Sequence, residues 1–295
     1  MSLHKPTVFQ GAATALITPF AGGKIDYASL ERLIEYQIAG GTAAILVAGT
    51  TGESATLTLE EHRELTQAAH AMIGGRVPLL VGCGSNATER AVCLAKLACA
   101  AGADALLCVT PYYNKASDRG VLAHYRAVCA ASDRPVLAYN VPSRTGMSLT
   151  LRNYRELAEL DGLCGVKEAS GDLGLLAELV SESGERLDVY CGNDTQTVAA
   201  MRLGACGVIS VLSNAFPDRM QALCRLCTDG SDRRAAQLQR ELLPLMQALS
   251  AEVNPIPIKY ALSCMGLCKP EYRLPLCPPA PDTCRRLERL FGNGE

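Results

Sequence analysis

The sequence predicts an α/β fold, a (β/α)8 TIM barrel with a C-terminal helical extension. Short apolar runs recur at an average spacing of about 28 residues, which suits the βα units of such a barrel. Amphipathic helical patterns lie between the runs, and most of them end at a glycine that can take the left-handed C-cap conformation. Strands and helices that alternate in this way form a parallel sheet, and eight units close the sheet into a barrel.

Each predicted strand is a run of mostly apolar residues, bounded by turn-forming residues and too short for a helix. In chain order the runs are AATALI (12–17), AAILV (43–47), PLLVG (78–82), DALLCV (104–109), PVLAYN (135–140), LCGVK (163–167), DVYCG (188–192) and GVISV (207–211). The helical patterns between them include YASLERLIEYQIAG, TLEEHRELTQAAHAMI, ATERAVCLAKLACAAG and LRNYRELAELDG.

The segment after the eighth run has helical periodicity, in DRRAAQLQRELLPLMQALSAE and in PIKYALSCMGL. This pattern predicts a helical extension and not a second sheet domain. We therefore expect a barrel that carries the functional site over residues 1–225 and an extension over residues 226–295.

Charge, hydropathy and cysteine usage exclude several classes of partner. The net charge at pH 7 is -2 and no basic block occurs, so no nucleic-acid partner is expected. No apolar run approaches the roughly 18 residues of a membrane span, so no membrane partner is expected. The 14 cysteines fall within strand and helix patterns of a chain too large for a disulfide scaffold. Reduced thiols in a cytoplasmic protein are therefore expected.

The turn after the second run is the first candidate for binding chemistry, because functional groups of a TIM barrel lie at the C-terminal strand ends. It reads AGTTGES, so Thr50 and Thr51 present hydroxyl and backbone N–H groups between Gly49 and Gly52. Such a turn can hold a carboxylate or a phosphate. Glycine-rich turns are common after strands, so this one is informative only together with the other strand ends.

The fourth and fifth runs end in VTPYYN and AYNVPSRTG. Tyr112, Tyr113 and Tyr139 can supply phenolic acid and base groups if their hydroxyls reach one another, although tyrosines are also common at barrel rims. Arg144 follows in a loop restrained by Pro142, and a guanidinium at the mouth of a site suits a bidentate contact to a carboxylate.

Lys167 ends the sixth run, in the stretch LCGVKEASGD. Lys167 and Lys259 are the lysines set among apolar residues, and only Lys167 ends a strand-like segment. An apolar barrel mouth disfavours the charged ammonium, so the pKa of this amine should fall. A nucleophilic free amine is then available for imine formation.

Two other kinds of site compete with this interpretation. Aldol chemistry can use zinc, but the chain has only four histidines and most lie in helical patterns, so no metal site is expected. The stretch VGCGSNATER matches a dinucleotide fingerprint at Gly82, Gly84 and Ala87. It follows the third of eight similar runs, however, without the two-half organisation of a doubly wound sheet.

Several of these motifs together resemble the dihydrodipicolinate synthase family, which belongs to a group of pyruvate-dependent class I aldolases that also contains N-acetylneuraminate lyase. The matching stretches are GTTGESATL (49–57), TPYYN (110–114), YNVPSRTG (139–146), GVKEASGD (165–172), GVISV (207–211) and NPIPIKYAL (254–262). The resemblance runs from about residue 9 to the end of the chain and implies the barrel fold. It implies a lyase of lysine and diaminopimelate biosynthesis that acts without a cofactor.

The resemblance assigns a role to each strand-end residue. Lys167 would form the Schiff base with pyruvate, and Thr50 and Thr51 would lie at the pyruvate carboxylate. Tyr139 would relay protons over the imine. Thr50 and Tyr113 would complete the relay, with Tyr113 contributed across a dimer interface of a homotetramer.

The same resemblance implies a second substrate, L-aspartate 4-semialdehyde. Arg144 would hold its carboxylate, and the Ile209 backbone carbonyl would line the pyruvate pocket. The product would be 4-hydroxy-tetrahydrodipicolinate. A lyase for sialic acid or a keto-deoxy sugar acid has no reason to place a guanidinium there, but that reading and a binding-only barrel remain as alternatives.

Synthases of this family that lysine inhibits have a regulatory pocket at the dimer interface. Its positions resemble Ser54, Ala55, His62, Asn86 and Tyr112 of this chain. Leu59 replaces the family's histidine, and Arg90 replaces the glutamate that meets the effector's ammonium. A reversed charge costs on the order of a few kcal/mol at an effective dielectric near 20, so weak or absent lysine inhibition is expected.

Overall fold

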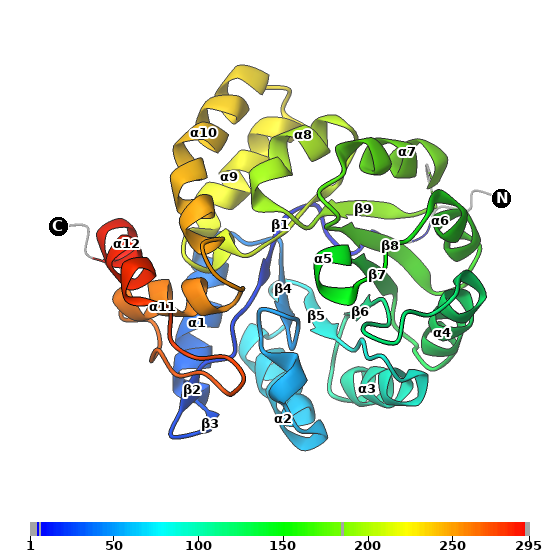
Figure 1. Cartoon of the computed structure of the whole chain (residues 1–295), viewed down its shortest axis with the longest axis horizontal. Helices are drawn as coiled ribbons and strands as arrows, with labels where there is room; N and C mark the ends of the chain where they lie inside the picture. The colour runs from blue at the N-terminus through cyan, green and yellow to red at the C-terminus, as the bar shows by residue number, and fades with distance from the viewer. Residues whose placement is uncertain (1–4, 6, 184–185, 293–295) are drawn as a thin grey trace.

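The computed structural model describes residue 5, residues 7–183 and residues 186–292. Within these residues, eight parallel strands close into a barrel in the order β1-β10-β9-β8-β7-β6-β5-β4, as Figure 1 shows from one end. The strands are β1 (Gly11–Ala15), β4 (Ala44–Val47), β5 (Leu79–Gly82), β6 (Ala105–Val109), β7 (Val136–Asn140), β8 (Leu163–Glu168), β9 (Asp188–Cys191) and β10 (Gly207–Ser210). Each predicted run overlaps one of these strands, with differences of one or two residues at the ends, so the predicted barrel is confirmed.

The barrel is surrounded by helices that follow its strands (Figure 1). They are α1 (Tyr27–Ala39), α2 (Leu59–Ile73), α3 (Thr88–Ala100), α4 (Asp118–Ala130), α6 (Leu151–Ala158), α7 (Leu173–Ser183), α8 (Thr197–Arg202) and α9 (Pro217–Thr228). Helix α2 begins with a complete capping box, in which Thr58 and Glu61 each accept the other's backbone N–H. This capping box places the start of α2 where the predicted helical pattern TLEEHRELTQAAHAMI begins.

Two short elements were not predicted from the sequence. A hairpin of β2 (Phe20–Ala21) and β3 (Lys24–Ile25) follows β1, and its turn contains Gly22 and Gly23 in the left-handed region. Helix α5 (Pro142–Thr145) forms a single turn after β7. Proline begins α5 and Gly146 ends it with a positive φ, which is the usual placement of these two residues around a helix.

The apolar core has two layers. The larger layer fills the space between the strands and the surrounding helices, and a smaller cluster fills the barrel interior. Tyr139, Tyr190 and Ile209 belong to the interior cluster, so β7, β9 and β10 point these side chains into the barrel. A filled interior confines any ligand to the mouth of the barrel.

The predicted C-terminal helical extension is also confirmed. It consists of α10 (Asp232–Leu249), α11 (Ile256–Cys264) and α12 (Pro281–Phe291), of which α10 packs against α9 and α11 against α12 (Figure 1). Position 225, the predicted end of the barrel, lies in the last turn of α9, and the turn from Asp229 to Ser231 separates α9 from α10. No helix of the described residues is both long enough and apolar enough to cross a membrane.

Candidate active site

A cavity of about 430 Å³ lies at the C-terminal mouth of the barrel. Its walls include strand ends, the loops that follow them and the start of the extension. Among the predicted site residues, it is lined by Thr50, Thr51, Tyr139, Arg144 and Lys167. The structure therefore brings five predicted residues from three strand ends into one site.

Lys167 is almost fully buried, with 6% of its surface exposed. Burial lowers its pKa from 10.5 to about 8, with the Asp194 carboxylate opposing this shift and the Arg144 guanidinium adding to it. No ion pair to Lys167 occurs among the described residues. With a pKa of about 8, about a tenth of this amine is uncharged and nucleophilic at pH 7, far more than for an exposed lysine.

The residue after Lys167 fixes the end of its strand. The Glu168 carboxylate, also buried, accepts hydrogen bonds from Asn140 Nδ2 at 3.0 Å and from the Tyr154 hydroxyl. It also accepts from the backbone N–H of Ser170 at 2.6 Å. These donors come from β7, from α6 and from the loop after β8, so the strand end that carries Lys167 is anchored on three sides.

Tyr139 lies beside Lys167 because β7 and β8 pair with these two residues in register. The Lys167 Nζ lies 4.5 Å from the centroid of the Tyr139 ring. Burial raises the pKa of the Tyr139 phenol, while the Arg144 guanidinium and the Thr50 hydroxyl act to lower it. The phenol is thus protonated at neutral pH and sits where it can exchange a proton with a group bound to Lys167.

The threonine turn after β4 forms another part of the wall. Thr51 is buried, and its Oγ1 accepts a hydrogen bond of 3.0 Å from Asn254 Nδ2. Thr50 lines the cavity as well. The predicted anion-binding turn therefore faces Lys167 across the mouth.

Arg144 lies in α5, the single helical turn after β7, and lines the cavity. One guanidinium nitrogen donates to the backbone carbonyl of Asn254 at 3.0 Å. Asn254 thus connects the two groups that can bind carboxylates, with its side chain on Thr51 and its backbone on Arg144. Both contacts span more than a hundred residues of sequence, so no local pattern predicts them.

Two predicted residues do not line this cavity. Tyr113 is 90% exposed and has a φ of 72°, which is rare for a residue with a side chain. Its role across a dimer interface is not tested by a single chain and stays a prediction. Ile209 has its side chain in the barrel interior. Val211, two residues further along the chain, lines the cavity instead. The proposed contact of the Ile209 carbonyl also stays a prediction.

Asp194 is a site residue that the sequence analysis missed. Its Oδ2 accepts from the backbone N–H groups of Val211 and Leu212, at 3.0 and 2.8 Å. Burial raises the pKa of this carboxyl group, and its Oδ1 has no hydrogen-bond partner among the described residues. The available signal is the polar pair Asn193 and Asp194 directly after the seventh predicted strand, at a C-terminal strand end like that of Lys167.

The predicted regulatory residues line a second cavity of about 600 Å³ beside the first. Ser54, Ala55, His62, Asn86, Tyr112 and Arg90 are all in its wall. Leu59 is not in the wall and is partly exposed. The His62 Nε2 lies 2.7 Å from the Gly82 carbonyl, and burial lowers the pKa of His62, so its ring is neutral.

The dinucleotide-like glycines have a packing role. A Cβ at Gly82 would lie 2.1 Å from the Ala48 carbonyl oxygen, and one at Gly84 would lie 2.5 Å from Val109 Cγ1. Glycine is required at both positions because neighbouring strand ends approach so closely. No cluster of three or more histidine, cysteine, aspartate or glutamate side chains able to hold a metal occurs in the described part of the chain.

A buried barrel lysine with a lowered pKa, beside a tyrosine and a threonine turn, is the arrangement of an enzyme of the class I aldolase type. The comparisons with known proteins agree with this class. The model of the dihydrodipicolinate synthetase family matches residues 8–292. The chain belongs to this family.

Similar proteins cover nearly the whole chain. The 4-hydroxy-tetrahydrodipicolinate synthase of Oleidesulfovibrio alaskensis is 43% identical over 284 residues, which is 96% of this chain and 97% of that one. The crystal structure of dihydrodipicolinate synthase from Aquifex aeolicus is 41% identical, with a TM-score of 0.94 and coverage of 96% and 97%. The chloride-inhibited enzyme from Acinetobacter baumannii, complexed with pyruvate, is 39% identical with the same TM-score and coverage.

Proposed function

We propose that the chain condenses pyruvate with L-aspartate 4-semialdehyde through an imine on Lys167, giving 4-hydroxy-tetrahydrodipicolinate for diaminopimelate and lysine biosynthesis. The observation that carries this proposal is the buried Lys167, whose pKa is about 8 and which lies against Tyr139 in the barrel mouth. The relatives named 4-hydroxy-tetrahydrodipicolinate synthase support the choice of substrates.

The chemistry begins with the neutral amine of Lys167, which attacks the keto carbon of pyruvate and expels water to form the imine. Loss of a methyl proton gives an enamine, whose carbon bonds to the aldehyde carbon of the second substrate. The amino group of that substrate then attacks the imine carbon, closes the ring and releases Lys167. No external cofactor is needed, because the imine nitrogen itself accepts the electron pair.

Tyr139 and Thr50 would move the protons that these steps require. The Tyr139 phenol is protonated and its ring lies close to the Lys167 nitrogen. Hydrogen bonding with the Thr50 hydroxyl acts to lower the pKa of this phenol. Tyr113 would complete the relay from a second copy of the chain, and its 90% exposure in one chain supports a contact made only in the assembly. We propose a cytoplasmic homotetramer built from two tight dimers, by analogy with the family.

The carboxylates of the two substrates would bind at different places. The Thr50–Thr51 turn, together with the Ile209 carbonyl region, would hold pyruvate, because the turn supplies hydroxyl groups close to Lys167. Arg144 would hold the carboxylate of L-aspartate 4-semialdehyde, because its guanidinium is exposed at the outer rim of the cavity.

Borohydride trapping tests the imine directly. Incubation with pyruvate and borohydride should add one lactyl-sized mass to the peptide that carries Lys167, and Lys167→Ala should abolish the adduct. An adduct at Lys259, or none, would refute the assignment. The acceptor is tested by comparing turnover with L-aspartate 4-semialdehyde and with N-acetylmannosamine. Preference for the sugar would identify a sialic acid lyase. Pyruvate binding without turnover of either acceptor would identify a binding protein.

A further inference from the structure

We propose that Glu53, held by Lys259 and Arg273 of the C-terminal extension, is a positioning residue that sets the Thr50–Thr51 turn for the carboxylate of pyruvate. This inference rests on the proposed function. None of the three residues lines the wall beside Lys167, so each would act through the turn.

The turn has a conformation that needs support. Ala48 and Glu53, at its two ends, have φ values of 50° and 54°, in the left-handed region that residues with side chains rarely adopt. Backbone bonds within the turn join the Glu53 N–H to the Thr50 carbonyl at 3.1 Å and the Ser54 N–H to the Gly49 carbonyl at 3.2 Å. A strained turn of this kind persists only when its surroundings fix it.

The side chain of Glu53 supplies such a restraint. It is fully buried and forms an ion pair with Lys259, whose side chain is also fully buried. The Glu53 Oε2 accepts a further hydrogen bond of 3.2 Å from the backbone N–H of Arg273. Both carboxylate oxygens are therefore bound by the extension, more than 200 residues away in the sequence.

Lys259 is suited to this structural task and not to catalysis. Its Nζ also donates to the Glu271 carbonyl at 3.1 Å and lies 4.3 Å from the centroid of the Phe20 ring. Burial lowers the pKa of Lys259 overall, and the Glu53 carboxylate opposes this shift by favouring the charged ammonium. The paired ammonium is held by Glu53, whereas Lys167 forms no ion pair among the described residues.

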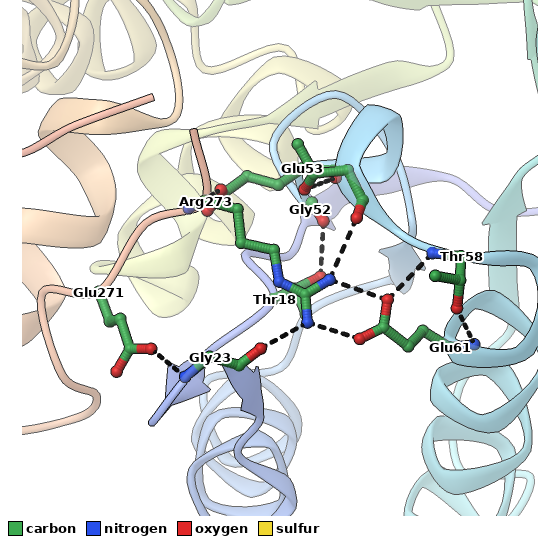
Figure 2. Close-up of polar contacts among 9 residues, drawn as sticks. Thr18, Gly23, Gly52, Glu53, Thr58, Glu61, Glu271 and Arg273 are labelled. Carbon is green, nitrogen blue, oxygen red and sulfur yellow. Dashed lines mark hydrogen bonds and ion pairs between the residues drawn. The ribbon is translucent and has the colours of Figure 1, made fainter. Parts of the chain in front are cut away.

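Arg273 extends the restraint to the next turn of chain, as Figure 2 shows. Its guanidinium donates to Glu61 Oε2 at 2.8 Å and to the Gly23 carbonyl at 2.8 Å. It also donates to the Thr56 carbonyl at 3.1 Å. The segment from Glu53 to the start of α2 is therefore clamped between the extension and the β2–β3 hairpin. In the same view, Thr18 donates to the Gly52 carbonyl at 2.7 Å, within the turn itself.

Charge-neutral replacement of the pair separates positioning from simple stability. In Glu53→Gln/Lys259→Met both charges are removed together, so no unpaired charge is left in the core. Circular dichroism, size-exclusion chromatography and thermal melting would establish that the variant folds. Arg273→Met, at a partly exposed position, is a second variant that leaves the buried pair in place.

We expect both variants to raise KM for pyruvate, on the order of tenfold for the double variant and less for Arg273→Met, with kcat at saturating pyruvate changed by less than about threefold. KM for the aldehyde substrate should be unchanged. Borohydride trapping should need correspondingly more pyruvate for half-maximal labelling, and added pyruvate should raise the melting temperature less than in the wild type.

The matched control is Glu35→Gln/Arg76→Met, which removes an ion pair between exposed side chains. It should leave both KM values unchanged. If the folded double variant and Arg273→Met both have the wild-type KM for pyruvate, the positioning role is wrong while the proposed function stands. If the wild-type protein itself forms no pyruvate adduct, the proposed function fails and this inference fails with it.

Discussion

The Lys167 ammonium nitrogen lies 4.5 Å from the centroid of the Tyr139 ring, and the two residues are direct partners in the β7–β8 pairing. Their relative position is therefore set by backbone hydrogen bonds and not by a flexible loop. A one-residue change of register would turn one of the two side chains to the opposite face of the sheet. The amine and the phenol thus form a rigid pair at the barrel mouth.

Imine formation should increase with pH through about 8. The reacting form of Lys167 is the neutral amine, and burial brings its pKa to about 8, so the neutral fraction rises as the pH passes that value. The initial rate of borohydride trapping with pyruvate, or kcat/KM for pyruvate, should follow this titration. A rate that is independent of pH between 6.5 and 9 would contradict the role of Lys167 as a titrating nucleophile.

The charges around Lys167 should move this titration in opposite directions. Asp194 raises the pKa of Lys167 and Arg144 lowers it. Asp194→Asn should therefore shift the trapping profile to lower pH, and Arg144→Met should shift it to higher pH. Shifts in the same direction would show that general disruption of the site, and not charge, determines the profile.

Tyr139→Phe should reduce kcat by about 10²- to 10³-fold, the usual contribution of a positioned proton-transfer group. Its ring would remain in place beside Lys167, so KM for pyruvate should change little. Steady-state kinetics with both substrates measures these effects. Tyr260→Phe, which removes a hydroxyl bonded to Glu288 on the surface, is the control and should leave kcat unchanged.

Mixed assemblies can establish whether Tyr113 acts across an interface. Tyr113→Phe and Lys167→Ala should each have little activity alone. A dimer with one chain of each kind would contain one complete site and one site that lacks both groups. Mixing should therefore restore activity in one of the two sites of each mixed dimer. Size-exclusion chromatography would verify the exchange of chains, and mixing without recovery would place Tyr113 in the site of its own chain.

Lysine should inhibit the enzyme weakly or not at all. Arg90, in the wall of the second cavity, would repel the effector's ammonium, with a cost on the order of a few kcal/mol. Half-inhibition at sub-millimolar lysine would contradict this expectation. Arg90→Glu combined with Leu59→His should increase inhibition, and Leu59→His alone serves as the control that keeps the positive charge.

The Glu61–Arg273 pair should contribute stability that is lost in acid. Hydrogen bonding to Arg273 lowers the pKa of Glu61 from 4.5 to about 2. A lowered carboxyl pKa stabilises the folded state above the unfolded value, and this stability disappears as the pH falls towards about 2. Glu61→Gln should therefore reduce the free energy of unfolding at pH 7 by on the order of 2 kcal/mol, with the difference from wild type shrinking below pH 4.5.

Denaturant unfolding at several pH values measures this difference. Glu60→Gln, one position earlier in α2, removes an exposed carboxylate that pairs with Arg63 and is the matched control. Its effect on the unfolding free energy should be small at every pH, because exposed ion pairs contribute little.

Periodicity was enough to predict the eight strands, because buried parallel strands separated by amphipathic helices leave a strong pattern in the sequence. The rule that functional groups lie at C-terminal strand ends then identified Lys167, Tyr139 and the threonine turn as neighbours. These predictions succeed because strand ends converge by geometry, without any knowledge of side-chain contacts.

The remaining parts of the site depend on contacts that no local pattern encodes. Asn254 reaches Thr51, and Lys259 reaches Glu53, each across more than 200 residues. Lys259 stands among apolar residues in the sequence, but nothing near it in the chain identifies its carboxylate partner. Asp194 could have been found from its position after β9, since a buried acid there follows the same strand-end rule.

Two different parts of the fold support the site: the barrel strands and the turn of α5. Lys167 and Tyr139 are fixed by the barrel ladder, whereas Arg144 lies on the single turn of α5 and is bonded to the extension through Asn254. If Arg144 holds the second carboxylate as proposed, substitutions beside it in that turn should change which aldehyde is accepted, while the barrel ladder keeps Lys167 and Tyr139 in place. One inherited reaction centre can therefore serve enzymes with different acceptors, and the residues around Arg144 are the place to look for that difference.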